Sequence, residues 1–418
     1  MARAPQRNPA IFAAVVVLAL VVSALWLWHS RILPLPARLV LKAVSFDALP
    51  GWGETDARAA LAAFRRSCAT LAKEPPTHAL GGEGYAGSVA DWTQACAGAP
   101  GADADANAAR RYFETVFTPL QATDGQNDGQ NADALFTGYY EPEIHGSRRR
   151  HGPYATPIYG EPEDLVSADL GLFREDLRGQ HVTGRIIGHT FVPYFTRAQI
   201  DAGGLPHAPV LLYADDPVQV FFLHIQGSGR ARLESGAFVR LAYAGQNGRP
   251  YTPVGRTLIA EGAIDRTRMS MQAIRSWMRA HQDAARGMME SDQSFVFFRL
   301  APLGDPSLGS PGSEGVPLTP GASIAVDEHV HPLGAPFFVA ASVPDIDPNK
   351  PDRPLDRLFV AQDTGGAIKG AARADVFWGF GRDAESVAGR MKSAGRFYVL
   401  LPRALAAHVS SQSGSGAP

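Results

Sequence analysis

The sequence has few charged side chains and no excess of one sign. Asp, Glu, Lys and Arg make up 19% of its 418 residues, against roughly 25% in an average soluble protein. A net charge of −2 and an isoelectric point near 6.6 do not indicate nucleic-acid binding, which requires a basic surface. Glycine and proline are abundant instead, with 43 and 32 residues. This composition favours short strands joined by turns over a helical bundle, and the length allows two or three domains.

A long apolar run occurs near the start. Residues 11–28 contain no charge, and Arg3 and Arg7 precede them. The run reaches the short end of a membrane span and exceeds a usual signal-peptide core. Because arginines mark the cytoplasmic side, we expect the rest of the chain to be exported and anchored by residues 11–28. Cleavage at Val22-Ser23-Ala24 is the alternative. The run has no cysteine, which excludes a lipid-modified N-terminus.

Cysteine is nearly absent, since the chain has only Cys68 and Cys96. Two thiols cannot complete a structural zinc site, which needs four ligands. In an exported protein an isolated pair more often forms a disulfide than two free thiols. We therefore predict a Cys68–Cys96 disulfide, with two buried free thiols as the alternative.

Apolar periodicity predicts helices early in the chain and short strands after them. Helical spacing occurs in 55–73, 106–120 and 266–282. Short apolar runs broken by Pro and Gly predict strands, and these runs are 134–140, 185–195, 209–215, 323–327, 335–343, 358–363, 375–379 and 396–402. The polar tract 124–133 and the Pro/Gly/Ser-rich segment 302–316 are expected to be loops. The last residues have the composition of a disordered tail.

Several short motifs do not meet the requirements of known sites. "QGSGR" has Gln226 where a serine nucleophile elbow needs glycine, so we expect a tight glycine loop there. "GGAIKG" has the wrong order for a phosphate loop, and "GFGRDA" lacks the third glycine of a dinucleotide site. "DEHVH" would place His329 and His331 on one face of a strand. No third ligand accompanies them, so we predict no metal site.

The stretch "AQDTGGAIKGAARADVFWG", residues 361–379, holds two aspartates on either side of a glycine-rich loop. Asp363 ends one predicted strand and Asp375 opens the next. Aromatic neighbours would desolvate Asp375 and raise its pKa, which suits a general acid. Glycine residues let a backbone approach a ligand closely. Aspartates are also common in turns, so spacing alone leaves a structural role open.

Seven motifs in this chain occur in the order of a known family. They are "FTGYYEPEIHGS", "YATPIYG", "HIQGSGR", "YAGQNGRPYTPVGR", "MSMQAIRSWM", "GVPLTPGASIAVD" and "VAQDTGGAIKG…DVFWG". Together they resemble the membrane-bound lytic murein transglycosylase A family over about residues 45–403. The resemblance implies a double-psi β-barrel built from discontinuous segments, an inserted second β-rich domain, and a groove between them for a glycan strand.

The resemblance also implies boundaries and a reaction. We expect a helical part packed on the barrel at 45–140, the inserted domain at 141–255, the barrel at 256–405 and a disordered tail at 406–418. The reaction would cleave the β-1,4 bond between N-acetylmuramic acid and N-acetylglucosamine without water or a cofactor, leaving a 1,6-anhydro end. The implied location is the periplasmic side of a Gram-negative envelope. Glycan strands, the membrane and cell-wall synthesis or division proteins are the implied partners.

The family's roles transfer to matching positions in this sequence. Asp375 matches the single acid–base residue, Asp363 matches its neighbour in the site, and Asp327 completes a three-aspartate module. The residues expected to contact substrate are Thr137, Tyr139, Tyr140, Glu141, Gln226, Gly227, Ser228, Asp327, Gly365, Gly366 and Lys369. Alternation along a strand predicts that one of Tyr139 and Tyr140 faces the core.

One carboxyl suffices for this reaction, because the sugar's own C6 hydroxyl is the nucleophile and is already tethered. Two other functions remain open. A hydrolase would use Asp363 as the second carboxyl that ordinary glycosidases need. A peptidoglycan-binding protein would use the same fold without catalysis. The loop between Asp363 and Asp375 is slightly longer than the family pattern leads us to expect.

Overall fold

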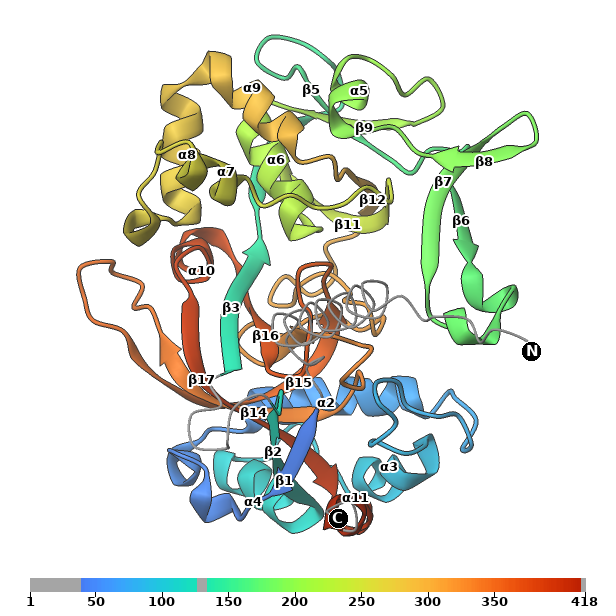
Figure 1. Ribbon diagram of the computed structural model, residues 1–418. Helices are drawn as coiled ribbons and strands as arrows, with labels where there is room; N and C mark the ends of the chain where they lie inside the picture. The colour runs from blue at the N-terminus through green and yellow to red at the C-terminus, as the bar shows by residue number, and fades with distance from the viewer. Residues whose placement is uncertain (1–38, 126–133, 415–418) are drawn as a thin grey trace, which may run out of the picture.

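The computed structural model describes residues 39–125 and 134–414, and it has two connected bodies (Figure 1). A β-barrel with packed helices forms one body, and a second sheet with its own helices forms the other. The predicted anchor at 11–28 and most of the tract 124–133 lie outside the described residues. Within the described ranges, no helix has the length and apolar character needed to cross a membrane.

Six strands close the barrel. Each pairs with the next in a ring, and the last, β3, pairs back to the first, β17. In ring order they are β17 (Lys392–Pro402), β14 (Pro336–Val343), β15 (Arg353–Thr364), β13 (Ser323–Val326), β16 (Arg373–Phe380) and β3 (Ala134–Glu141). The pairs β13–β15 and β16–β3 are parallel, and the others are antiparallel. The predicted mainly β fold with a barrel is confirmed.

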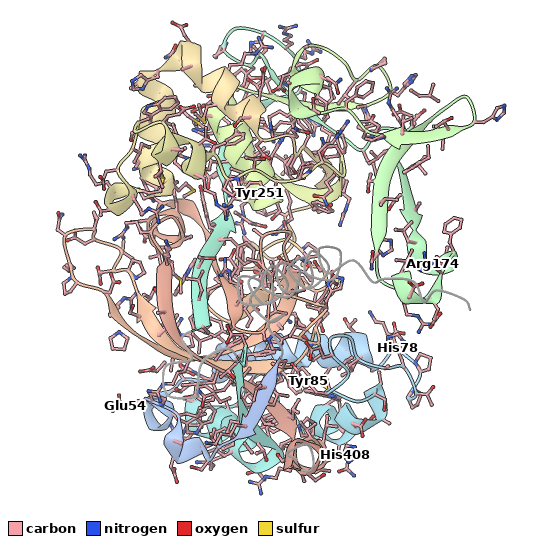
Figure 2. All side chains as sticks on the ribbon, viewed as in Figure 1. Glu54, His78, Tyr85, Arg174, Tyr251 and His408 are labelled. Atoms are coloured by element: carbon pink, nitrogen blue, oxygen red, sulfur yellow. A yellow bond between two sulfur atoms is a disulfide. The ribbon has the colours of Figure 1, made fainter. Side chains whose placement is uncertain are left out.

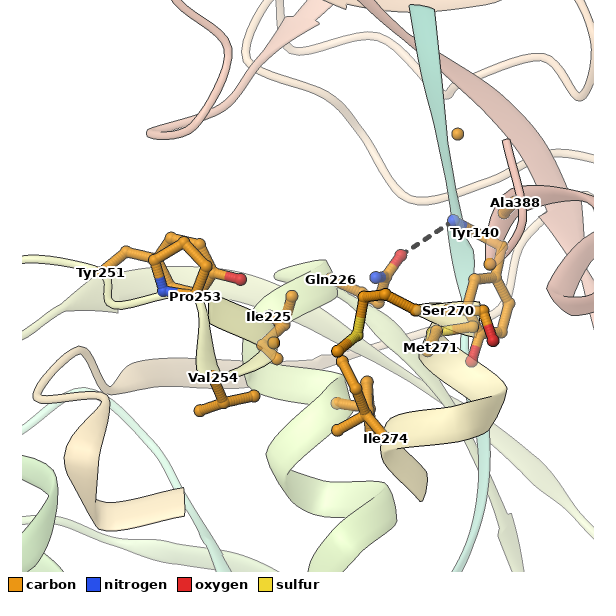
Figure 3. Close-up of a pocket in the computed structure, with 15 residues that line it drawn as sticks. Tyr140, Ile225, Gln226, Tyr251, Pro253, Val254, Ser270, Met271, Ile274 and Ala388 are labelled. Carbon is orange, nitrogen blue, oxygen red and sulfur yellow. Dashed lines mark hydrogen bonds between the residues drawn. The ribbon is translucent and has the colours of Figure 1, made fainter. Parts of the chain in front are cut away.

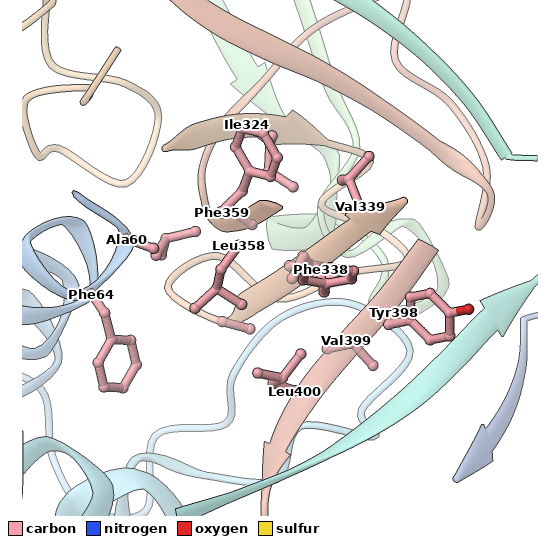
Figure 4. Close-up of a cluster of buried hydrophobic side chains, with 14 of the residues drawn as sticks. Ala60, Phe64, Ile324, Phe338, Val339, Leu358, Phe359, Tyr398, Val399 and Leu400 are labelled. Atoms are coloured by element: carbon pink, nitrogen blue, oxygen red, sulfur yellow. The ribbon is translucent and has the colours of Figure 1, made fainter. Parts of the chain in front are cut away.

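Helices and a short ladder cover the barrel on the side away from the second body (Figure 1). Phe64 packs against Phe113 and Phe117, with ring centroids 6.1 and 5.6 Å away. Figure 4 shows Phe64 facing Leu358 and other buried side chains of the barrel strands. The disulfide between Cys68 and Cys96 joins α2 to α3. The elements of this cover are β1 (Val40–Ala43), η1 (Phe46–Ala48), η2 (Trp52–Glu54), α2 (Arg58–Leu71), α3 (Val89–Ala97), α4 (Ala106–Val116), β2 (Phe117–Thr123) and α11 (Arg403–Gly414). Helix α10 (Gly381–Ala388) lies instead on the side of the second body, where Glu385 pairs with Arg275.

Two predicted boundaries differ from the structure in this body. The helix expected over 106–120 ends at Val116, and the chain continues as β2, which pairs with β17. Pro119 explains the early end, because proline lacks an N–H and biases the preceding residue away from helix. The tail expected from residue 406 begins inside α11, which extends to Gly414.

The second body is built on a six-stranded sheet. Its strands, in order, are β12 (Val296–Ala301), β11 (Phe238–Gln246), β10 (Gly229–Leu233), β4 (Glu143–Ser147), β9 (Val210–Ala214) and β5 (Thr156–Tyr159). Its helices are α5 (Arg197–Asp201), α6 (Pro217–Gln226), α7 (Val254–Ala260), η5 (Arg266–Arg268), α8 (Met271–Ala280) and α9 (Gln282–Ser291). Because β12 pairs with β11, this body extends beyond the boundary expected at residue 255.

A small third sheet projects from the side of the second body (Figures 1 and 2). Arg174 lies at its free end, between two short 3-10 helices. The elements of this projection are β6 (Val166–Asp169), η3 (Leu170–Leu172), η4 (Glu175–Leu177), β7 (His181–Ile187) and β8 (Thr190–Pro193).

A buried ion-pair cluster joins the two bodies at the end of β3. Glu141 is fully buried. Its carboxylate accepts hydrogen bonds from Arg230 of β10 at 2.8 Å and from Arg240 of β11 at 2.9 Å. The neighbouring Tyr140 hydroxyl accepts one from Arg275 of α8 at 2.8 Å. The strand that enters the barrel is therefore held on both sides by the second body.

Candidate active site

The barrel places two aspartates in one row across neighbouring strands. Ala325 of β13 pairs with Asp363 of β15 on one side and with Asp375 of β16 on the other, and Asp375 pairs with Thr137 of β3. Residues in register on adjacent strands point to the same face of a sheet. The aspartate Cα atoms are two strand spacings apart, roughly 10 Å. Because Ala325 has only a methyl group, it leaves room between the two carboxyl groups.

One oxygen of Asp375 is fixed by Thr137. The Thr137 hydroxyl lies 2.6 Å from Oδ1 of Asp375, and Nη2 of Arg373 donates to the same hydroxyl at 2.7 Å. The other oxygen, Oδ2, has no hydrogen-bond partner among the residues that the structure describes. Asp375 thus presents a single unbonded oxygen beside a fixed one.

The environment of Asp375 favours its protonated form. The pKa of Asp375 is raised to about 6. The main cause is burial, which disfavours the charged carboxylate, and the negative charge of Asp363 raises the pKa by a smaller amount. The hydrogen bond from Thr137 and the charge of Arg373 oppose the rise. The prediction that neighbouring groups raise this pKa is supported, but burial contributes more than Asp363.

Both oxygens of Asp363 are occupied by the protein. Oδ1 accepts from the backbone N–H groups of Ser313 and Thr364 and from the Ser313 hydroxyl, each at 3.0 Å, and Oδ2 accepts from Tyr139 at 2.8 Å. Burial raises the pKa of Asp363, while these hydrogen bonds lower it. A carboxyl bonded in this way is held rigidly, and neither of its oxygens is without a hydrogen-bond partner.

Successive residues of β3 face opposite ways. Tyr139 shares the face of Thr137, bonds Asp363, and has its ring 5.2 Å from that of Phe377. Tyr140 is buried on the other face, as the alternation predicted for one of the two tyrosines. It lines a cavity of about 270 Å³ behind the strand.

That cavity lies where the two bodies meet, and Tyr251 and Tyr140 line opposite sides of it (Figure 3). Gln226, at the end of α6, accepts a hydrogen bond from the backbone N–H of Tyr140 at 3.0 Å (Figure 3). Gly227 then ends the helix in the left-handed conformation, with φ 76°, and Ser228 follows. Tyr140 and Gln226 were expected to line the groove with Asp375, but the structure puts them behind β3.

Glu141, another residue expected to contact substrate, is instead fully buried in the ion pairs with Arg230 and Arg240. Its carboxylate also accepts the backbone N–H of Ser310 at 2.5 Å. The structure gives Glu141 a role in joining the two bodies.

Asp327 supports the loop between β15 and β16. It is 6% exposed, accepts the backbone N–H of Gly370 at 2.8 Å and lies 3.7 Å from the exposed ammonium of Lys369. Burial alone would raise the pKa of Asp327, but these neighbours and His329 together lower it. The same loop carries Gly365 and Gly366, placed beyond the last strand residue of β15.

The two histidines of "DEHVH" do not form a metal site. His331 is buried, with Nδ1 2.7 Å from the Tyr85 hydroxyl and Nε2 2.8 Å from the carbonyl oxygen of Ala371. His329 is exposed and contacts Asp327. In residues 39–125 and 134–414, no three His, Cys, Asp or Glu side chains converge as a metal site would require.

Sequence reasoning missed two residues of the site. Arg373 was not singled out, although a residue two positions before Asp375 on a strand must share its face. Ser313 comes from the linker 302–316, and no local pattern connects it to Asp363, 50 positions later. The first residue was open to prediction from periodicity, and the second was not.

Comparisons with known proteins agree with this architecture. The family described as "MltA specific insert domain" matches residues 135–299, and "3D domain" matches residues 322–401. The membrane-bound lytic murein transglycosylase A of Vibrio cholerae is 30% identical over 286 residues, which cover 67% of this chain and 69% of that protein.

Two solved structures are similar over most of the chain. A membrane-bound lytic murein transglycosylase from Agrobacterium tumefaciens has 31% identity and a TM-score of 0.76, covering 88% of this chain and 99% of that one. Escherichia coli MltA with bound chitohexaose has 27% identity and a TM-score of 0.62, covering 88% and 95%. The insert match reaches residue 299, consistent with β12 as a strand of the second body.

Proposed function

The chain belongs to the membrane-bound lytic murein transglycosylase A family, and we propose that it cleaves peptidoglycan with Asp375 as its only acid and base. The bond cut is the β-1,4 link between N-acetylmuramic acid and N-acetylglucosamine. The product carries a 1,6-anhydro ring on the muramic acid. The observation that carries this proposal is the state of Asp375, with Oδ1 fixed by Thr137 and a pKa raised to about 6.

In the first step the protonated Oδ2 of Asp375 gives its proton to the glycosidic oxygen as the bond to C1 of the muramic acid breaks. In the second step the carboxylate takes the proton of the C6 hydroxyl while O6 bonds to C1. The departing N-acetylglucosamine keeps the first proton, and Asp375 ends protonated again. Because the nucleophile belongs to the same sugar, the entropy cost of bringing it in is largely prepaid, and no water enters the product.

The hydrogen bonds of Asp363 favour this reaction over hydrolysis. A hydrolase needs a second carboxylate with a free oxygen, as nucleophile or as base for water. Both oxygens of Asp363 are instead bonded by Ser313, Thr364 and Tyr139. Asp363 therefore acts as a positioning residue that anchors Tyr139 and raises the pKa of Asp375.

The substrate class is consistent with the relatives. The Escherichia coli protein was crystallised with chitohexaose, a β-1,4-linked glycan, and the name shared by the relatives is murein transglycosylase. We place the enzyme on the periplasmic side of a Gram-negative envelope, held by residues 11–28. A variant that starts at residue 39 should appear in the soluble fraction, and retention in the membrane pellet would argue against this anchor.

Product analysis tests the reaction. Wild type acting on purified sacculi should release muropeptides one water lighter than hydrolytic products, measured by mass spectrometry. Asp375→Asn should release none while still sedimenting with sacculi. Products with a free reducing end would instead show the two-carboxylate hydrolase, and turnover retained in Asp375→Asn would reject Asp375 as the acid.

A further inference from the structure

The second body contains a cavity of about 740 Å³, a size typical of small-molecule sites. Residues of α6 from Pro217 to His224 form one wall, and α5, α8, α9 and β5 contribute the others. These elements, except α8, gather at the end of the molecule farthest from α2–α4 (Figure 1). The last residue of α6, Gln226, bonds to β3. Phe222, Ile225 and Gln226 of the same helix line the smaller cavity behind β3. Among the described residues, no barrel strand contributes to the larger cavity, which is therefore separate from the carboxylate row.

The walls combine apolar surface with charges of both signs. The apolar side chains that line it include Ile200, Val218, Phe221, Met278, Met289 and Phe295. Three aspartates and three arginines also line it. An uncharged sugar does not require such charges, whereas a short peptide presents an amine, carboxylates and apolar groups together.

One of the three aspartates has no hydrogen-bond partner. Asp216 caps the first N–H groups of α6 and pairs with Arg279 at 3.1 Å, and Asp215 lies 3.2 Å from His145. Asp201 accepts no hydrogen bond from any side chain or backbone group in the described part of the chain. Its carboxylate is available to an incoming ammonium group.

A buried donor in the same wall also lacks a partner. His224 is 5% exposed, and its Nδ1 lies 3.1 Å from Nη1 of Arg197. Because a guanidinium only donates, Nδ1 must accept, and the ring proton is on Nε2. Nε2 has no acceptor among the described residues. A buried donor without an acceptor is costly, and a carbonyl or carboxylate seated against this wall would satisfy it.

We propose that this cavity binds the peptide part of peptidoglycan. The amine of the peptide pairs with Asp201, and a carbonyl or carboxylate oxygen accepts from Nε2 of His224. The apolar side of the peptide lies on Phe221, Met278 and Phe295. This inference rests on the proposed function, since it assumes peptidoglycan as substrate. The second body would then bind the peptides that are attached to the glycan strand.

Methyl NMR can locate the binding directly. The chain has seven methionines, of which Met278 and Met289 line this cavity and Met269 and Met271 line the smaller one behind β3. The protein is labelled with ¹³C-methyl methionine, and signals are assigned by replacing each methionine in turn with leucine. The probe is the sugar-free tripeptide L-alanyl-γ-D-glutamyl-meso-diaminopimelate, and chitohexaose is the peptide-free control.

The tripeptide should shift the methyl signals of Met278 and Met289 saturably, and chitohexaose should not. Asp201→Asn should weaken tripeptide binding roughly tenfold, since a charged hydrogen bond is lost. Asp283→Asn is the matched control, because Asp283 is exposed on α9 and lies outside the cavity. Unshifted Met278 and Met289 signals, shifts confined to Met269 and Met271, or equal affinities for the two variants would each reject the site. Release of anhydro products is measured in a separate assay. Failure of the proposed reaction can therefore be distinguished from failure of the proposed peptide site.

Discussion

Thr137 donates its only hydroxyl proton to Oδ1 of Asp375, across 2.6 Å between two neighbouring strands. The direction is fixed because Arg373 approaches the same hydroxyl at 2.7 Å and a guanidinium can only donate. Oδ1 is therefore an acceptor whether Asp375 is charged or neutral. The acidic proton is left on Oδ2, the oxygen without a protein partner, where a glycosidic oxygen can receive it.

Thr137→Val tests this arrangement. The hydrogen bond from Thr137 lowers the pKa of Asp375, so its removal should move the alkaline limb of kcat/KM upward by about half to one pH unit. The value of kcat should fall, because the carboxyl loses its orientation. Thr137→Ser keeps the hydroxyl, so the alkaline limb of kcat/KM should stay at its wild-type pH. A limb that moves downward in Thr137→Val would mean that Arg373 pairs directly with Asp375.

The wild-type pH profile follows from the pKa of Asp375, which is raised to about 6. Catalysis begins with the protonated form, so kcat/KM should decline as pH rises through about 6 and lose roughly tenfold for each further unit. Initial rates on sacculi from pH 4.5 to 8.5 measure this limb. A profile that stays flat to pH 8 would contradict an acid at this position.

Asp363→Asn separates a positioning role from a catalytic one. Loss of the Asp363 charge removes one of the causes that raise the pKa of Asp375, so the alkaline limb should move to lower pH. Activity should fall but exceed that of Asp375→Asn, and the remaining product should still carry the anhydro ring. If both variants are equally inactive, Asp363 takes part in the chemistry itself.

The barrel strands and the aspartate pair could be predicted from the sequence, because both depend on local patterns. Short apolar runs bounded by Pro and Gly mark β13 to β17, and Asp363 and Asp375 fall within two of them. Helix α6 was missed, because its sequence PVQVFFLHIQ is apolar nearly all round and has no helical stripe. A helix that is apolar all round is buried on all sides, so its sequence lacks the polar face that would predict it.

Which face a residue occupies was harder to predict. Tyr140 and Glu141 stand in the same motif as Thr137 and Tyr139, yet both are buried away from Asp375. Alternation puts Tyr140 on the face opposite to Thr137, but only the pairing of Thr137 with Asp375 fixes which of the two faces the site. Glu141 has the parity of Thr137, and it lies away from the site because the pairing of β3 with β16 shifts register before it and its carboxylate bonds the second body. The partners of Glu141 come from β10 and β11, about 90 to 100 positions later. No local pattern encodes such contacts.

Glu314 should make stability depend on pH. Its carboxylate accepts from the Ser67 hydroxyl at 2.7 Å, and burial raises its pKa from 4.5 to about 7. Between these values the folded state holds the proton more tightly than the unfolded chain. The free energy of unfolding should therefore fall by about 3 kcal/mol as pH rises from about 4.5 to 7.

Glu314→Gln mimics the neutral form and should remove this part of the pH dependence. Urea unfolding at pH 5 and pH 8 measures it, with Glu328→Gln, an exposed site, as the control. The difference in stability between wild type and Glu314→Gln should change with pH, while Glu328→Gln should follow wild type. A constant difference would show that Glu314 titrates alike in the folded and unfolded states.

Glu141→Gln should destabilise the junction of the two bodies. The substitution keeps the shape but removes the negative charge that Arg230 and Arg240 share, both almost fully buried. Removing one partner of a buried ion pair typically costs about 3–5 kcal/mol, so urea unfolding should show a loss of this order. Glu143→Gln, at an exposed site two residues further on, makes the same change from carboxylate to amide and should lower the free energy of unfolding little. Equal stability of the two variants would mean that the carbonyl oxygens of the 302–308 segment, which also accept from both arginines, are sufficient to hold the guanidinium groups.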